Sequence, residues 1–374
     1  MAVILMINVP FAGHTNPTLP LAAALVRSGH KVTYVNAEEF RSKIENTGAE
    51  FIPYMNYPEF PTEQQKKTNC FRAAFDTAMN LNCKYDLLIY EMFFYPGFRI
   101  AEKLGIPCVR QFSQPAWNEN TLSSATWFFK LSCVLIDFQV MGKKNVDYMG
   151  LRNKTLGEAI IYDKPSLNIV YVPRIFQIDR DTFGEDYLFT IPMSESVSKS
   201  QIIPYEAMKP PVVYISLGSI ISNKGFCKEC IRAFGGKDMS IILNTGRIRP
   251  ETLGEIPTNI HAYSFVPQVE VLQHADVFLT HCGMNSVNEA MSYGVPMVAM
   301  PFINDQISNA KKIIDLGIGK RVRSFPSSGK QLYKTVNAVF EDTDMRKKSA
   351  AIQDSLKNET TMDEVVSRIE KLLA

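Results

Sequence analysis

A glycine turn between a buried strand and a helix most constrains what this chain can fold into. The apolar run 276–280 is typical of a parallel strand buried on both faces, and 287–291 begins a helix. Gly283 lies between them, where we expect it to turn the backbone sharply and let a ligand approach closely. Asn285 or Ser286 can cap the helix. Because backbone N–H groups at a helix start bind anions, the sequence predicts a diphosphate site here.

Further polar side chains follow this turn. Glu289 lies one helical turn after Ser286 on the same face, where its carboxylate could accept hydrogen bonds from ribose hydroxyls. The next buried strand, 297–300, is followed by Asp305 and Gln306. Ligands of open α/β sheets bind at the carboxyl ends of the strands. We therefore expect these two side chains to bind a hydroxylated group beyond the phosphates.

A histidine occupies a comparable position in the N-terminal half. The apolar run 3–9 predicts a strand, and the loop 10–17 that follows it contains His14. A lone histidine is more often structural than catalytic, but this one lies at the carboxyl end of a strand. The ordinary histidine pKa of about 6.5 suits proton abstraction near neutral pH. His14 is therefore a candidate general base.

Motifs in fixed order along both halves of the chain carry a family resemblance. They comprise Gly13, His14 and Pro17, then 265–268, 281–286, Glu289, 294–296, Pro301, Asp305 and Gln306. This pattern resembles the nucleotide-sugar-dependent glycosyltransferases that modify small molecules, a superfamily of UDP-glycosyltransferases and bacterial macrolide glycosyltransferases. The resemblance covers essentially the whole chain. It implies the GT-B fold, an α/β architecture of two facing Rossmann-like domains with a central cleft and a C-terminal helix that returns to the N-terminal domain.

The same resemblance assigns the catalytic pair. It implies that His14 deprotonates the acceptor hydroxyl, and that His30 is structural. The family places an aspartate beside this histidine, after a strand that here covers 87–90, and Glu91 stands in its place. Glutamate is one methylene longer, so pairing with His14 requires a shifted backbone or ring. Asp86 is the competing candidate, but it precedes the strand and so lies at its wrong end.

The resemblance also implies a donor site and a mechanism. Plant relatives carry tryptophan where this chain has Phe265 and Met284. We therefore expect the nucleotide base either to stack on the ring of Phe265 or to pack against it. Gln268 could bond a pyrimidine edge or the ribose, and UDP is preferred to dTDP. Single displacement with inversion needs no metal and no cofactor, since the helix start, His281, Ser286 and Ser219 stabilise the diphosphate. The expected donor-binding residues are Gly13, Ser219, Thr245, Phe265, Val266, Gln268, His281, Gly283, Met284, Asn285, Ser286, Glu289, Asp305 and Gln306.

Aromatic residues suggest where the acceptor binds. An apolar pocket would suit a lipophilic macrolide, polyketide or flavonoid-like hydroxyl compound. Ordinary core packing or a helix dimer face explains most of these residues equally well, and an interfacial helix presenting a lipid acceptor is a further alternative. The expected acceptor-binding residues are Phe93, Phe94, Trp117, Trp127 and Phe128.

Length and composition fit a two-domain protein. We expect an acceptor-binding domain over 1–195, a proline- and serine-rich linker over 196–211, a donor-binding domain over 212–358 and a C-terminal helix over 359–374. A net charge of +2 without a basic patch argues against nucleic acid as a partner. No apolar stretch is long enough to span a membrane. Seven scattered cysteines favour a reducing cytoplasm and argue against disulfides. We expect a monomer or a homodimer.

Two other functions remain open from the sequence. A nucleotide-sugar epimerase or hydrolase could use the same architecture, but it would need several carboxylates near the anomeric carbon. A non-catalytic homologue acting as a partner protein is supported only by glutamate at position 91. Retention of His14 and of the donor motifs favours the transferase.

Overall fold

The chain divides into two compact units. The computed structural model describes residues 1–124, 145, 147–151, 155–192, 202–218, 223–302, 304–324 and 328–373. Unit 1 comprises Met1–Met193 together with Glu359–Ala374, and unit 2 comprises Ser194–Asn358. No helix in the described part is both long and apolar enough to cross a membrane.

Unit 1 is built on a sheet of seven parallel strands. The strand order is β3-β2-β1-β4-β5-β6-β7, so the chain builds outward from β1 in one direction and then, from β4, in the other. The strands are β1 (Val3–Ile7), β2 (Lys31–Asn36), β3 (Glu50–Pro53), β4 (Leu87–Glu91), β5 (Cys108–Phe112), β6 (Leu167–Val170) and β7 (Tyr187–Phe189).

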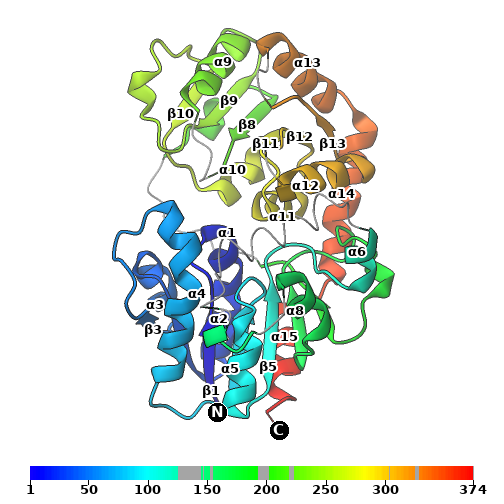
Figure 1. Cartoon of the computed structure of the whole chain (residues 1–374). Helices are drawn as coiled ribbons and strands as arrows, with labels where there is room; N and C mark the ends of the chain where they lie inside the picture. Colours follow the sequence, from blue (N-terminus) through cyan, green and yellow to red (C-terminus); the bar gives the residue numbers. More distant parts are fainter. Residues whose placement is uncertain are drawn as a thin grey trace. The chain divides into compact units, whose positions relative to one another are not determined.

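The helices of unit 1 cover both faces of this sheet. Figure 1 shows the long helix α4 beside α5, while α2 and α15 belong to the opposite layer. The helices are α1 (Ala12–Thr15), α2 (Leu19–Arg27), α3 (Arg41–Glu45), α4 (Glu63–Asn80), α5 (Pro96–Leu104), α6 (Glu119–Ser124), α8 (Leu156–Tyr162) and α15 (Met362–Glu370).

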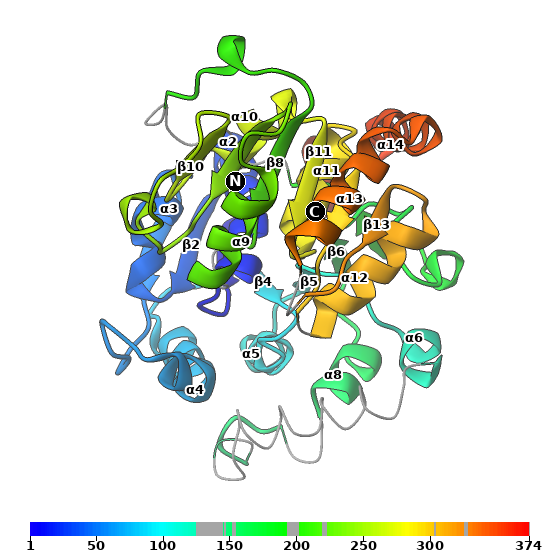
Figure 2. The same cartoon turned by 90° about the horizontal axis from the view of Figure 1, so that it is seen from above.

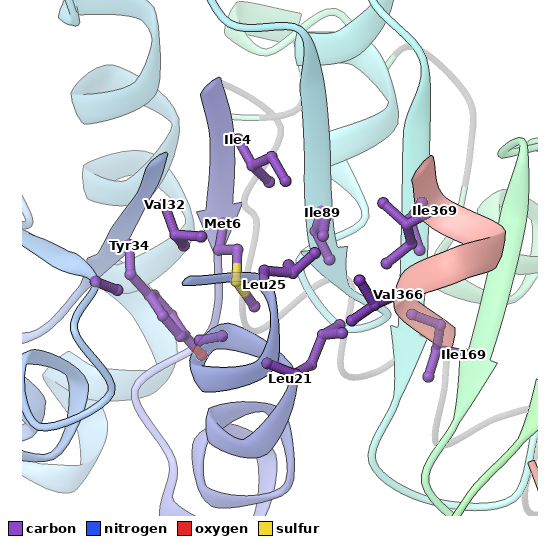
Figure 3. Close-up of a cluster of buried hydrophobic side chains, with 14 of the residues drawn as sticks. Ile4, Met6, Leu21, Leu25, Val32, Tyr34, Ile89, Ile169, Val366 and Ile369 are labelled. Atoms are coloured by element: carbon purple, nitrogen blue, oxygen red, sulfur yellow. The ribbon is translucent and has the colours of Figure 1, made fainter. Parts of the chain in front are cut away.

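The alternation of side chains along β1 explains this layering. Ile4 pairs with Val32, and Met6 pairs with Tyr34, so these four side chains share one face of the sheet. That face packs against α2 and α15 in a core where Ile4 and Met6 are fully buried (Figure 3). The adjacent residues of β1 point to the other face, which is why β1 reads as an uninterrupted apolar run.

The last helix of the chain belongs to unit 1. Val366 and Ile369 of α15 are buried in the same core as Leu25 and Ile89 (Figure 3). His30 strengthens this packing, since its Nε2 lies 3.1 Å from Glu370 Oε1. The expected return of the C-terminal helix to the N-terminal domain is therefore confirmed.

Unit 2 repeats the arrangement with six parallel strands in the order β10-β9-β8-β11-β12-β13. Helices α9 and α13 lie side by side over one face (Figure 2), where Val213, Ile241 and Leu279 are buried beneath them. The strands are β8 (Val212–Ser216), β9 (Ser240–Asn244), β10 (Ile260–Tyr263), β11 (Val277–Thr280), β12 (Met297–Ala299) and β13 (Gly319–Arg321). The helices are α9 (Lys224–Phe234), α10 (Gln268–His274), α11 (Met284–Ser292), α12 (Asn304–Asp315), α13 (Gly329–Phe340) and α14 (Thr343–Ser355).

Strand order reverses once in each sheet. The reversal falls between β1 and β4 in unit 1, and between β8 and β11 in unit 2. Loops leaving neighbouring strands diverge at such a point, and ligands of doubly wound folds bind there. The expected α/β class with two Rossmann-like units is confirmed, and each predicted site follows a strand at a reversal.

Close packing of α5 on β4 gives a test of this core. A methyl group at Gly97, near the start of α5, would overlap the buried ring of Tyr90. We expect Gly97→Ala to destabilise the protein by about 1–3 kcal/mol through overpacking, measured by urea denaturation. Gly13→Ala is the matched control, because nothing lies within 4 Å of a methyl group there. Equal stability of the two variants would contradict the packing described here.

Candidate active site

The loop after β1 carries His14. Phe11 precedes the short helix α1, and its carbonyl accepts a 2.9 Å hydrogen bond from the His14 backbone N–H. Asn8 restrains this loop through hydrogen bonds. Its side-chain amide donates to the His14 carbonyl at 3.2 Å, to Thr18 Oγ1 at 3.1 Å and to Tyr34 Oη at 2.8 Å. Burial raises the pKa of Tyr34 to about 12, so its hydroxyl keeps its proton. This buried network fixes the backbone that carries His14.

Glu91 is the last residue of β4 and lies directly beside this loop. Its carboxylate is fully buried, and its Oε1 lies 2.9 Å from His14 Nδ1. Its Oε2 accepts a 2.9 Å hydrogen bond from the backbone N–H of Phe93, where the chain turns after the strand. The longer side chain is thus accommodated by this turn, and the structure brings together the two residues predicted as the catalytic pair.

Aromatic rings flank the His14 imidazole. Phe93 meets it edge to face with ring centroids 4.8 Å apart, and Phe11 lies at 6.1 Å. The His14 side chain keeps 24% of its surface exposed, whereas Glu91 is inaccessible. The imidazole is therefore accessible from solvent, and the carboxylate is not.

Sequence reasoning missed Ser113, which follows β5 directly. Ser113 is buried, and its hydroxyl lies 2.7 Å from His14 Nδ1 and 2.9 Å from Glu91 Oε1. The signal was its place after a strand: β5 pairs with β4, so the residue after β5 lies next to the residue that ends β4. That pairing order becomes visible only in the fold.

The remaining acceptor residues differ in their placement. Phe94 is fully buried and packs against Phe71, with ring centroids 6.4 Å apart. Trp117 is half-buried in the loop between β5 and α6. Trp127 and Phe128 lie outside the described residues. Of the five predicted acceptor residues, the structure brings Phe93 against His14.

The two alternatives near the pair have other partners. Asp86 Oδ2 accepts a 2.8 Å hydrogen bond from the Val3 backbone N–H, at the amino end of the sheet and away from His14. His30 Nδ1 accepts from the Ala2 N–H at 3.2 Å. His30 thus ties the start of the chain to α15, in keeping with a structural residue.

The turn after β11 differs in detail from the prediction. The left-handed residue is Cys282, with φ of +68°, whereas Gly283 has a β-region backbone and is itself the N-cap of α11. No side chain caps the helix, so the prediction that Asn285 or Ser286 does so is wrong. Asn285 and Ser286 instead lie within the first turn, where backbone N–H groups have no carbonyl of the same helix to bond.

Glycine at position 283 is required for a different reason from the one predicted. A Cβ there would lie 2.5 Å from His281 Nε2, and a Cβ at Gly218 would lie 2.5 Å from His281 Cε1. The imidazole is therefore packed between two glycines from the loops after β8 and β11. Burial lowers the pKa of His281 to about 4, so the ring is neutral at physiological pH. Its buried Nδ1 has no hydrogen-bond partner among the described residues.

Gln268 joins several predicted donor-binding residues. Its side-chain oxygen accepts a hydrogen bond from Tyr214 Oη at 3.0 Å, and its amide donates to Ser286 Oγ at 3.0 Å and Glu289 Oε2 at 2.5 Å. Both ends of the amide are therefore engaged within the protein. Ser286 and Glu289 lie together on α11, as their spacing predicted.

Other predicted donor residues divide into exposed and buried positions. Phe265 is 60% exposed, which leaves its ring open to solvent, whereas the next residue, Val266, is buried. Thr245 is buried, and its hydroxyl donates to the Ile248 carbonyl at 2.6 Å. Met284 is buried at the start of α11. Gly13 is exposed in α1, and Ser219 lies outside the described residues.

Asp305 and Gln306 occupy the first turn of α12. Asp305 is exposed, whereas Gln306 is buried and accepts a 3.0 Å hydrogen bond from the Phe302 backbone N–H. Asn309, one turn later, donates to the Cys282 carbonyl at 2.9 Å. This bond connects α12 to the turn that carries His281 and Gly283.

Two aspartates separated by one residue are candidate ligands for a metal ion, and the chain contains two such Asp-x-Asp triplets, 179–181 and 342–344. Asp342 caps α14 and accepts a 2.8 Å bond from Lys320 Nζ, so it serves the helix start. Asp179 and Asp181 belong to a short turn of unit 1. Among the described residues no group of three or more histidine, cysteine or acidic side chains is arranged to hold a metal ion.

Comparison with known proteins matches this geometry to one family. The family model described as "UDP-glucoronosyl and UDP-glucosyl transferase" matches residues 206–364. An NDP-glycosyltransferase, YjiC, of Bacillus licheniformis is 31% identical, with 99% of this chain and 98% of that protein covered. The oleandomycin glycosyltransferase of Streptomyces antibioticus is 26% identical, with 95% and 87% covered.

The fold agrees with the sequence comparison. A solved structure of the glycosyltransferase of kitacinnamycin superimposes with a TM-score of 0.84 at 26% identity, covering 100% of this chain and 99% of that one. Both units contribute to a match of this extent. The chain therefore belongs to the UDP-glycosyltransferase family, in the group that includes macrolide and other natural-product glycosyltransferases, and it is a glycosyltransferase.

Proposed function

We propose that this enzyme transfers a hexose from a UDP-sugar, or from a dTDP-sugar, to a hydroxyl group of a lipophilic small molecule, with inversion at the anomeric carbon. Unit 1 supplies acceptor activation, and unit 2 binds the donor. The observation that carries this proposal is the His14–Glu91 pair, in which a buried carboxylate lies 2.9 Å from Nδ1 of a partly exposed imidazole.

The pair supports general base catalysis. A carboxylate facing Nδ1 holds a proton on that nitrogen, which places the basic lone pair on Nε2. In the proposed step, Nε2 takes the proton of the acceptor hydroxyl while its oxygen bonds to the anomeric carbon. The bond from that carbon to the diphosphate oxygen breaks, and its electron pair leaves with the diphosphate. Glu91 stabilises the imidazolium that forms.

The start of α11 and His281 support stabilisation of the leaving group. Backbone N–H groups at a helix start and a neutral imidazole donor can bind the developing negative charge without reorganising. The depressed pKa of His281, about 4, keeps this ring a neutral donor throughout the physiological range. We propose that the reaction needs no metal, because these groups take the place of a bridging cation.

The donor and acceptor classes rest on different observations. In the proposed complex the Glu289 carboxylate, which accepts a hydrogen bond from Gln268, also accepts hydrogen bonds from ribose hydroxyls, and this favours UDP over dTDP. The exposed ring of Phe265 is available to stack on a base. For the acceptor, Phe11 and Phe93 beside His14 favour an apolar molecule. The names of the oleandomycin and kitacinnamycin relatives support a natural product.

A transfer assay in EDTA tests the proposed function. UDP-glucose, UDP-galactose, UDP-N-acetylglucosamine and dTDP-glucose are each combined with macrolides, flavonoids and simple phenols, and adducts are detected by mass spectrometry. We expect a hexose adduct whose anomeric proton coupling shows a β-linkage from an α-linked donor. His14→Ala should lower turnover by about 10²–10⁴-fold while nucleotide binding by calorimetry is retained. An α-linked product would exclude single displacement, and full activity of His14→Ala would remove His14 from the mechanism.

Two substitutions at Glu91 distinguish the effect of its negative charge from the effect of its side-chain length. Glu91→Gln keeps the length but loses the charge that stabilises the imidazolium, so we expect kcat to fall by about 10²–10⁴-fold. Glu91→Asp keeps the charge but withdraws it by about one C–C bond, some 1.5 Å, and we expect about a tenfold loss. Steady-state kinetics with far-UV circular dichroism checks both. A Glu91→Gln enzyme as active as Glu91→Asp would contradict the charge assignment.

Burial of His281 makes stability depend on pH. An unfolded histidine titrates near pH 6.5, but burial lowers the pKa of His281 to about 4, so the unfolded chain binds an extra proton between these values. Stability from this residue therefore falls as the pH drops from 6.5 towards 4. The loss between pH 7 and pH 5 should be about 2 kcal/mol.

Urea denaturation of the wild type and of His281→Gln at both pH values measures this contribution. The pH-dependent loss should be smaller in His281→Gln by that amount. His274→Gln is the matched control, because that histidine lies in the same unit. An equal pH dependence of the wild type and His281→Gln would show that His281 is not buried as a neutral ring.

A further inference from the structure

Three adjacent strands of unit 1 place three side chains in mutual contact. His14 follows β1, Glu91 ends β4, and Ser113 follows β5, in a sheet where β4 lies between β1 and β5. Ser113 Oγ lies 2.7 Å from His14 Nδ1 and 2.9 Å from Glu91 Oε1, and these two atoms are themselves 2.9 Å apart. The three polar atoms therefore form a triangle in which each is within hydrogen-bond distance of the other two.

The protons in this triangle can be assigned from chemistry. A carboxylate only accepts, so the single hydroxyl proton of Ser113 is donated to Glu91 Oε1. Ser113 Oγ then faces His14 Nδ1 with a lone pair, and Glu91 Oε1 faces the same nitrogen with another. Both contacts are favourable only if Nδ1 carries the proton, since the opposite tautomer would set a nitrogen lone pair against them.

The same hydroxyl also restrains Glu91. Glutamate has one more rotatable bond than the aspartate of the family pattern, so its carboxylate needs an additional restraint to keep one orientation. The Phe93 N–H holds Oε2 at 2.9 Å, and Ser113 holds Oε1. Ser113 is 4% exposed, so its hydroxyl is largely shielded from bulk solvent.

We propose that Ser113 is a positioning residue of the general base, which fixes the orientation of the Glu91 carboxylate and holds the proton of His14 on Nδ1. The inference rests on the proposed function, because it presumes that His14 acts through Nε2. It adds a third member to the pair and explains how glutamate can replace aspartate at position 91.

The test compares Ser113→Ala with Ser113→Thr, which keeps the hydroxyl. We expect Ser113→Ala to lower kcat by about tenfold or more with the KM for the nucleotide sugar unchanged, and to shift the acidic limb of the pH–kcat profile. Ser113→Thr should restore much of the loss. Ser123→Ala, an exposed serine of the same unit, is the control and should match the wild type. Wild-type kcat and pH profile in Ser113→Ala would overturn the proposal.

A second test combines Ser113→Ala with Glu91→Asp in one variant. In Glu91→Asp the shortened carboxylate withdraws from His14, so Ser113 becomes the bridge between them. Loss of the hydroxyl should therefore cost more in Glu91→Asp than in the wild type. Equal losses in both backgrounds would show that Ser113 does not act through this pair. A loss that threonine fails to rescue, accompanied by a lowered melting temperature, would assign Ser113 a packing role and also overturn the proposal.

A spectroscopic measurement separates this inference from the proposed function. Among the five histidines, nitrogen-15 NMR of the imidazoles reports the protonated nitrogen of His14, assigned by its absence in His14→Ala. We expect the Nδ1–H form in the wild type and a greater share of the Nε2–H form in Ser113→Ala. This result holds even if no acceptor is turned over. An Nε2–H form in the wild type would refute the role of Ser113 directly.

Discussion

Reversal of strand order in a parallel sheet is the constraint on which both candidate sites depend. Parallel strands all end at one edge, so residues far apart in the sequence meet there if their strands are neighbours. β1 and β4 are neighbours in unit 1 although the chain forms two further strands between them. That pairing brings His14 and Glu91 to 2.9 Å. In unit 2 the same relation of β8 to β11 brings Gly218 against His281.

Burial of Glu91 shows how the fold prepares a charged group for chemistry. An isolated carboxylate in a protein interior is strongly disfavoured unless hydrogen bonds replace its water shell. Glu91 receives such bonds from the Phe93 N–H and the Ser113 hydroxyl, and it faces the His14 imidazole. A preorganised carboxylate of this kind costs no rearrangement when the imidazole gains its proton, which is the general advantage of a fixed dipolar environment. In the proposed mechanism, the turn over 91–94 therefore holds the carboxylate that stabilises the imidazolium of His14.

Sequence patterns predicted the parts of the molecule that obey local rules. Apolar runs predicted β1, β4 and β11, because the apolar pattern of a buried strand is a local property of the sequence. A motif of fixed residue order predicted His14 and Glu91. Ser113 was not predicted because its contacts with His14 and Glu91 depend on β5 lying next to β4, which no local sequence pattern encodes. The capping prediction for Asn285 and Ser286 failed for a related reason. The left-handed residue of this turn is Cys282 and the N-cap is Gly283, so α11 begins at Met284, two residues earlier than capping by Asn285 would require.

The two histidines of the candidate sites illustrate how environment divides one side chain between two roles. His14 is partly exposed, and its Nδ1 lies 2.9 Å from the buried carboxylate of Glu91. His281 is buried between two glycines, and desolvation alone lowers its pKa to about 4. A ring that accepts a proton is suited to activate a hydroxyl, whereas a ring that stays neutral can donate a hydrogen bond to a diphosphate at any physiological pH. In the proposed mechanism, Gly218 and Gly283 therefore act on the donor site through the burial of His281, and Glu91 acts on the general base through its contact with His14.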